Sequence, residues 1–222
     1  MSERDRLPIF PLRTVLYPGG LLPLHIFEPR YRRMISSCHE NEPCFGVVLL
    51  KRGSEVGKRP PTHAIGTSAT ILEHITLADG RSNLLVKGER RFEIIESDWD
   101  LGYMVATVDW LESASTPGST PDVEDTLERI QHLLSQYIAA YNRSTGQQAT
   151  LGDFSNDGAA FAYEIASSLP LDNERRQLLL EARPLGQLLA LLEETIRRET
   201  ALLMISGSVS LSDRAGGRFT SN

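Results

Sequence analysis

The side chains best suited to chemistry in this sequence belong to two cysteines and five histidines. A cysteine beside a histidine can act as a nucleophile, and Cys38, His39 and Cys44 together could begin a zinc site. A structural zinc site needs two pairs of closely spaced ligands, and no second pair follows these residues. We therefore predict no metal site and interpret both cysteines as free thiols, while a small hydrolase that uses Cys38 or Cys44 stays an open alternative.

Two further patterns resemble functional motifs but differ from them in spacing or setting. The loop Gly53–Lys58 has three residues between its glycines where a phosphate-binding loop needs four, and Arg59 follows its lysine in place of Ser or Thr. The paired carboxylates Glu193 and Glu194 lie on an expected exposed helix face, where arginines one turn later can pair with them. The sequence therefore predicts no catalytic residue and no cofactor.

An arginine-rich segment surrounds Tyr31. Arg30, Arg32 and Arg33 flank this aromatic side chain, and guanidinium groups beside an aromatic ring can hold phosphate or stack on a base. The first 60 residues carry ten basic and six acidic side chains, although the whole chain has a net charge of -6. Three arginines are few for a surface that follows a nucleic-acid backbone. We therefore favour a helix with Tyr31 in the core and its arginines paired with Glu28 or exposed to solvent.

Residues 1–112 consist of short apolar segments separated by Gly, Pro or Asp-Gly, which indicates a β-rich domain of roughly six strands. Pro8 and Pro11 place the first strand at an edge or a barrel seam, because proline cannot donate a ladder hydrogen bond. Glu28-Pro29 begins a short helix that ends near His39, and Asp79-Gly80 forms a hairpin turn. The expected strands are Leu7–Leu12, Leu21–Phe27, Phe45–Leu50, Gly66–Leu77, Ser82–Lys87, one through Phe92 and Ile94, and one from Tyr103 to Asp109.

Residues 113–122 form a linker rich in Ser, Thr, Pro and Gly, and apolar residues recur at helical spacing after it. The expected helices are a long one through Leu127 and Tyr141, Ala159–Leu169 with an N-cap from Ser155 to Asp157, one from Asp172 to Glu181, and one that begins at Pro184. Their apolar faces predict a helical bundle over residues 123–205 that packs on the barrel. Residues 206–222 have little to bury, and we expect them to be disordered.

The composition is that of a soluble globular protein, with 41% hydrophobic and 23% charged residues. No signal peptide opens the chain, and no apolar run approaches the ~18 residues that a transmembrane helix needs. We expect a cytoplasmic protein that does not bind membranes.

The segment Leu7–Met34, LPIFPLRTVLYPGGLLPLHIFEPRYRRM, closely resembles the start of the N-terminal substrate-binding domain of Lon proteases. The shared pattern is a Leu-Pro-x-Phe-Pro-Leu strand, a Val-Leu-x-Pro-Gly turn and then Leu-Pro-Leu-x-Ile-Phe-Glu-Pro-Arg-Tyr. Further matches are Gly66-Thr67, Asp79-Gly80-Arg81, Gly88 with Arg91 and Phe92, and the C-terminal stretch LPLDNERRQLLLEARPLGQLLALLEE. The resemblance implies an α+β fold, in which a PUA-like β pseudo-barrel is followed by a C-terminal helical bundle.

The resemblance also implies a function, namely a stand-alone, non-catalytic module that binds unfolded or extended polypeptide without the ATPase and peptidase domains of a full Lon protease. Binding is expected at apolar surface left exposed where the barrel meets the bundle, or at an unpaired strand edge. The candidate patch consists of Tyr17, Arg30, Tyr31 and Arg33. RNA binding is the alternative, because PUA-like barrels also occur in RNA-binding proteins. A partner protease and a homodimer stay open.

Overall fold

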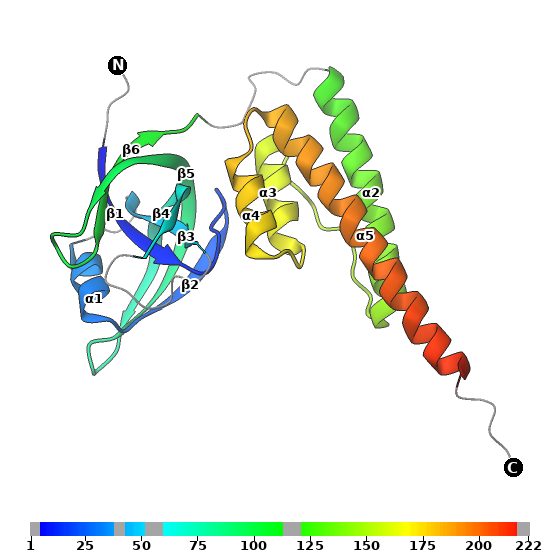
Figure 1. Ribbon diagram of the computed structural model, residues 1–222, viewed down its shortest axis with the longest axis horizontal. Coiled ribbons are helices and arrows are strands. Elements are labelled where there is room, and N and C mark those ends of the chain that lie inside the picture. Colours follow the sequence, from blue (N-terminus) through cyan, green and yellow to red (C-terminus); the bar gives the residue numbers. More distant parts are fainter. Residues whose placement is uncertain (1–4, 38–42, 52–59, 113–120, 217–222) are drawn as a thin grey trace, which may run out of the picture.

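The structure, a computed structural model, describes residues 5–37, 43–51, 60–112 and 121–216. Within these residues, strands come first and four longer helices follow, with one short helix among the strands (Figure 1). The strands are β1 (Asp5–Leu12), β2 (Leu21–Ile26), β3 (Pro43–Leu50), β4 (Thr62–Thr76), β5 (Ser82–Asp98) and β6 (Met104–Trp110). The helices are α1 (Pro29–Ser36), α2 (Pro121–Thr145), α3 (Gly158–Ser168), α4 (Asn173–Glu181) and α5 (Leu185–Gly216).

The six strands form one sheet that closes on itself. Their order is β2-β5-β4-β3-β1-β6, and a further pairing of β5 with β6 completes the ring. Strand β5 makes this possible because its first half, from Ser82 to Lys87, pairs with β2, whereas its second half, from Phe92 to Asp98, pairs with β6. Among the described strands, β2 therefore has a neighbour on one side only.

The continuous strand β5 differs from the two strands that the sequence predicted for the same residues. The expected strand ended at Lys87, just before Gly88. In the structure, Gly88 instead lets the backbone of β5 approach the backbone of the turn after β1. A Cβ atom at Gly88 would lie 2.2 Å from the carbonyl oxygen of Tyr17. Two hydrogen bonds join the same segments, from the Gly19 amide to the Gly88 carbonyl (2.8 Å) and from the Gly88 amide to the Gly20 carbonyl (2.9 Å). Glycine here lets the turn after β1 lie directly on β5.

Strand β1 lies between β3 and β6, so of the two positions that its prolines predicted, a sheet edge or a barrel seam, the edge is excluded. The ladder to β6 covers Asp5–Ile9 and the ladder to β3 covers Ile9–Leu12, so the two overlap only at Ile9. Pro8 precedes the ladder to β3, and Pro11 lies beyond the ladder to β6. Each proline can therefore direct its missing donor toward a side that has no ladder at that point.

Helix α1 covers one end of the barrel. Tyr31, Met34 and Ile35 are buried on its inner face, in one cluster with barrel residues such as Phe10 and Phe45. The position of Tyr31 in the core, as the helical spacing predicted, is confirmed.

The predicted N-caps of two bundle helices are also confirmed. The carboxylate of Asp157 accepts hydrogen bonds from the amides of Ala159 and Ala160, and that of Asp172 accepts one from the amide of Arg175. These bonds fix the starts of α3 and α4. The linker residues 113–120 lie outside the described residues, and the domain boundaries stay predictions.

Helix α5 runs beside α2 and extends beyond it (Figure 1). It continues to Gly216, past Ser206, where the sequence predicted the start of a disordered tail. No proline interrupts this segment, and each residue added to an existing helix gains one backbone hydrogen bond. The helix can therefore continue past Ser206. Among the described helices, none is both long and apolar enough to cross a membrane.

The barrel and the bundle meet through a junction that α4 supplies. Val15, Tyr17 and Leu49 from the barrel side share an apolar cluster with Leu179 and Leu180. The Tyr17 hydroxyl donates to the carbonyl of Arg176 (2.9 Å), and the Gln177 side-chain amide donates to the carbonyl of Ile65 (3.0 Å). These buried contacts hold the two parts of the fold together.

Candidate functional site

A groove of about 420 Å³ lies where β1 and β2 come near each other without pairing. Beyond Ile9, β1 has no partner on the side that β6 occupies earlier, and the described sheet gives β2 no partner except β5. Both strands line the groove, together with the start of α1. Its apolar lining includes Phe10, Leu12, Pro23, Leu24, Phe27 and Tyr31.

The floor of the groove is rigid and its rim is exposed. The rings of Phe10 and Tyr31 pack 4.2 Å apart between centroids, and both side chains are buried. Burial raises the pKa of the Tyr31 hydroxyl, so this residue is neutral at physiological pH. The Phe27 side chain is 61% exposed, although it directly follows β2. A large aromatic side chain beside an apolar hollow is typical of a binding surface.

Polar groups at the rim already pair with one another. Arg30 forms an ion pair with Glu28 at 2.8 Å, and its guanidinium lies 4.6 Å from the centre of the Tyr31 ring. His25 Nδ1 lies 2.7 Å from Asn83 Oδ1 on the neighbouring strand. Arg13 also lines the groove, so its Arg and Glu side chains are two arginines and one glutamate. Two arginines are few contacts for a phosphate backbone, and the groove is suited mainly to apolar groups.

The structure separates the four residues that the sequence proposed as a patch. Arg30 and Tyr31 line the groove. Tyr17 is only 2% exposed and lies in the junction, where its hydroxyl is bonded to Arg176. Arg33 is exposed on α1 and is not among the residues that line the groove. The four residues thus do not form one surface.

Sequence reasoning missed the role of Phe27 in the groove. Leu21, Pro23 and His25 are exposed and alternate with more buried residues along β2, so Phe27 continues the outward-facing series. This two-residue period was the available signal. The sequence predicted Phe27 as the end of the expected strand Leu21–Phe27 and assigned it no role.

Of the residues considered for catalysis and metal binding, His25 lines the groove, and several others lie outside the described residues. Cys38, His39 and the loop Gly53–Lys58 lie outside the described residues, as does the side chain of Cys44. In the part of the chain that the structure describes, no group of three His, Cys, Asp or Glu side chains could hold a metal ion. His63 pairs with Glu181 at 3.2 Å.

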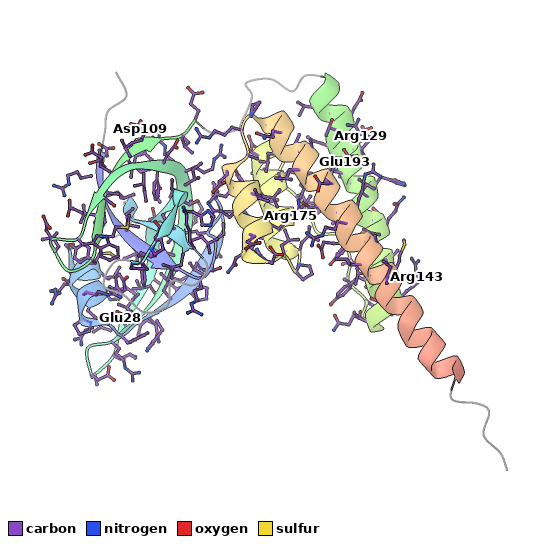
Figure 2. All side chains as sticks on the ribbon, in the orientation of Figure 1. Glu28, Asp109, Arg129, Arg143, Arg175 and Glu193 are labelled. Carbon is purple, nitrogen blue, oxygen red and sulfur yellow. The ribbon has the colours of Figure 1, made fainter. Side chains whose placement is uncertain are left out.

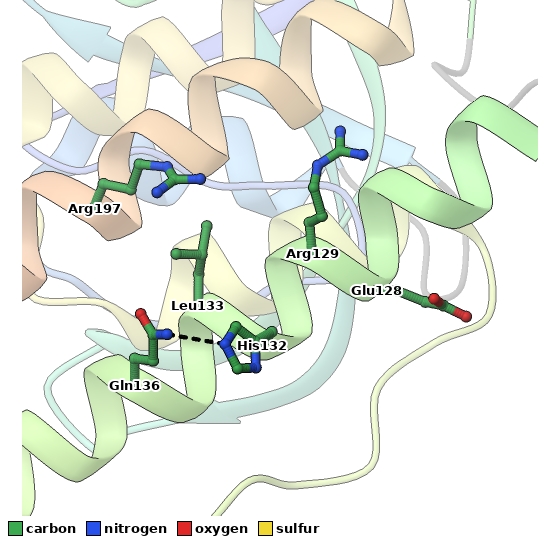
Figure 3. Close-up of a pocket in the computed structure, with 6 residues that line it drawn as sticks. All are labelled: Glu128, Arg129, His132, Leu133, Gln136 and Arg197. Carbon is green, nitrogen blue, oxygen red and sulfur yellow. Dashed lines mark hydrogen bonds between the residues drawn. The ribbon is translucent and has the colours of Figure 1, made fainter.

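A second hollow, of about 450 Å³, lies between α2 and α5 (Figure 3). Arg129 and Arg197 face it from the two helices, and Leu133 lies between them. Glu193 of α5 pairs with Arg129 of α2 at 3.9 Å and with Arg197, one turn further along α5, at 2.7 Å; Glu193 and Arg129 are labelled in Figure 2. Exposed ion pairs of this kind contribute about 0–1 kcal/mol each and do not by themselves indicate a ligand.

Comparison with known proteins shows what the chain is similar to. The family model of the ATP-dependent protease La (LON) substrate-binding domain matches residues 6–198. Lon protease 2 of Myxococcus xanthus is 26% identical over 91% of this chain, and Lon protease 2 of Herpetosiphon aurantiacus is 30% identical over 89% of it. The chain spans about a quarter of the length of these relatives, since the matches cover 25% and 23% of them.

Two solved structures share the fold. The Lon N-terminal domain protein from Xanthomonas campestris is 29% identical, with a TM-score of 0.59 over 84% of this chain and 98% of that chain. The N-terminal domain of the Lon protease of the Mycobacterium avium complex is 19% identical, with a TM-score of 0.60 over 87% of this chain. The second likeness concerns the fold alone. Together they agree with the predicted α+β architecture.

Proposed function

Because the chain belongs to the family of Lon substrate-binding domains, we propose that it binds extended polypeptide in the groove between β1 and β2 and catalyses no reaction on it. The observation that carries the proposal is the exposed Phe27 at the rim of an apolar groove. A domain of this family is expected to hold protein substrates, and a groove with an apolar floor suits the side chains that an unfolded chain exposes.

The free edge of β2 supplies backbone hydrogen bonds for such a chain. Pro23 lies in the middle of β2, and strand prolines normally turn their nitrogen toward the unpaired side. Backbone groups alternate in direction along a strand, so Leu21 and His25 direct their N–H and C=O groups the same way as Pro23. An extended peptide can add to this edge. Its side chains on one face can then contact Phe27, and those on the other face can contact Leu24.

Phe27→Ala tests the proposal through the affinity for a labelled unfolded polypeptide, measured by fluorescence anisotropy. An aromatic anchor at the centre of an interface contributes at least about 1–2 kcal/mol, so we expect the affinity to fall about tenfold. Leu101→Ala is the matched control, because Leu101 is 58% exposed and does not line the groove. Equal binding by both variants would remove the groove from the proposal.

The same titration decides between polypeptide and RNA. Capture of apolar side chains should change little between ~50 and ~200 mM salt, whereas phosphate contacts lose affinity steeply over that range. Binding of single-stranded RNA that disappears with salt and with Arg30→Ala, in the absence of polypeptide binding, would contradict the proposal. We also propose a cytoplasmic location, a partner protease and a homodimer, which are separate from the binding proposal.

A further inference from the structure

A third, smaller pocket lies at the junction of barrel and bundle, away from the groove and from the hollow between α2 and α5. Its volume is about 240 Å³, and its walls come from β5, the segment after β6, and α3. Arg91 and Tyr163 line it and are both only 4% exposed. Glu89, Glu112 and Asp157 also line it. We refer to this site as the junction pocket.

Arg91 is a buried cation that has no carboxylate partner in the described chain. Its Nη1 donates to the carbonyls of Leu180 (2.8 Å) and Ala182 (2.9 Å), and its Nη2 donates to the carbonyl of Glu112 (3.4 Å). Burial lowers the pKa of Arg91, but a guanidinium stays charged at physiological pH. The carbonyls of Leu180 and Ala182 belong to the C-terminal end of α4 and offset part of this charge. The described residues offer no carboxylate to Arg91 and no acceptor to its Nε, so a further anion can bind there.

Tyr163 supplies a second unmatched group. Its hydroxyl is buried, and the residues that the structure describes give it no hydrogen-bond partner. Its ring stacks on Tyr17 with centroids 5.2 Å apart, so the hydroxyl is held in place. Burial raises the pKa of Tyr163, and the hydroxyl is therefore a donor at neutral pH. An unsatisfied buried hydroxyl is costly unless a ligand or water bonds to it.

The acidic side chains around the pocket restrict the charge of the anion. Asp157 is already used as the N-cap of α3, and Glu89 lies 3.6 Å from Lys87. Arg90 also lines the pocket, and its guanidinium lies 4.8 Å from the centre of the Trp110 ring. Glu112 remains, with an exposed side chain. Negative charge near the entrance disfavours a doubly charged phosphate far more than a singly charged group. A monocarboxylate fits the charge, and the volume suits a group about the size of one amino acid.

We propose that the junction pocket binds a carboxylate, with the guanidinium of Arg91 and the hydroxyl of Tyr163 as its donors. The carboxylate comes either from the C-terminus of a polypeptide or from a small free acid. The inference does not rest on the groove, because none of the residues that carry it lines the groove.

Isothermal titration calorimetry on the full chain tests this proposal with N-acetylalanine and its neutral amide, and with the peptide Ser-Gly-Ala ending in a free carboxylate or an amide. These probes lack large apolar side chains and so avoid the groove. We expect the acids to bind at least about tenfold more tightly than the amides, as hydrogen bonds to a charged group imply. Binding of the free-acid peptide alone identifies the polypeptide source, and binding of N-acetylalanine identifies the small acid.

Tyr163→Phe removes only the hydroxyl and should weaken acid binding about tenfold. Tyr141→Phe is the matched control, because the Tyr141 hydroxyl bonds to Gln147 outside the junction pocket. Glu112→Gln removes a negative charge and should tighten acid binding, an effect that a merely structural role would not produce. Equal affinity for acid and amide, no acid binding at ~10 mM, or an unchanged affinity in Tyr163→Phe would overturn the proposal, and Phe27→Ala should leave these titrations unchanged.

Discussion

The groove and the junction differ in how far their side chains are exposed and in whether their backbone groups are hydrogen-bonded. In the groove, Phe27 is exposed and one edge of β2 is unpaired. In the junction, Tyr17 and Gln177 are buried and donate to backbone carbonyls of the other half of the molecule. Satisfied buried contacts fix geometry, whereas exposed apolar surface and a free strand edge are available to a partner. On our proposal the buried contacts of the junction fix the barrel against the bundle, and the groove is the surface offered to extended polypeptide.

The largest effect should come from Gly88→Ala, which acts on the side of the comparison that we consider structural. The new Cβ would lie 2.2 Å from the Tyr17 carbonyl oxygen, and backbone cannot move away as a flexible side chain can. The turn that carries Tyr17 into the junction would be displaced. We expect the free energy of unfolding to fall by at least about 3 kcal/mol in urea denaturation.

Gly152→Ala is the control for that substitution. No atom lies within 4 Å of a Cβ at Gly152, and its backbone is not left-handed. Its free energy of unfolding should stay within about 0.5 kcal/mol of the wild type. Similar stability in both variants would show that the contact between the turn and β5 does not position the junction.

Tyr17→Phe should have an intermediate effect. The substitution removes one buried hydrogen bond and leaves the Arg176 carbonyl without this donor, at a cost of about 1–2 kcal/mol at neutral pH. Chemical denaturation of the two proteins measures this difference. An unchanged free energy of unfolding would mean that the hydroxyl contributes nothing to holding barrel and bundle together.

The pH dependence of the free energy of unfolding, compared between the wild type and Tyr17→Phe, gives an independent test. Burial raises the pKa of Tyr17 well above its ordinary value near 10. The unfolded chain therefore loses this proton first, and stability is fully present below pH 10 and falls as the pH rises beyond it, by up to about 1.4 kcal/mol per pH unit for each such tyrosine. Tyr17→Phe should lose stability less steeply above pH 10 than the wild type does.

Local signals predicted most of the fold, and long-range contacts account for most of the errors. The caps Asp157 and Asp172 and the hairpin turn at Asp79-Gly80 depend on neighbouring residues, and the structure has them as expected. The predicted break in β5, which is wrong, and the choice between edge and seam for β1 both depend on which distant strand lies alongside. No spacing within Ser82–Asp98 reveals that Gly88 meets the backbone of Tyr17.

The candidate sites show the same limit more strongly. Tyr17, Tyr31 and two arginines were grouped because they are close in sequence and of suitable type, but burial separates Tyr17 from the rest. The junction pocket joins Arg91 to Tyr163, which are distant in sequence and share no motif. Such a pair can be recognised only once the packing shows that neither buried group has its usual partner.

The smallest expected effect is that of Phe27→Ala on stability. Phe27 is 61% exposed, and its ring lies 6.1 Å from that of His25, which is a weak contact. We expect its free energy of unfolding to change by less than about 0.5 kcal/mol, so that a tenfold loss of polypeptide affinity would report the groove rather than the fold. Urea denaturation of Phe27→Ala, with Leu101→Ala as the control variant, measures this free energy of unfolding. A loss above about 1.5 kcal/mol would mean that Phe27 packs into the barrel in solution. The groove would then be as closed as the junction, and the free edge of β2 would be the only binding feature left to this side of the barrel.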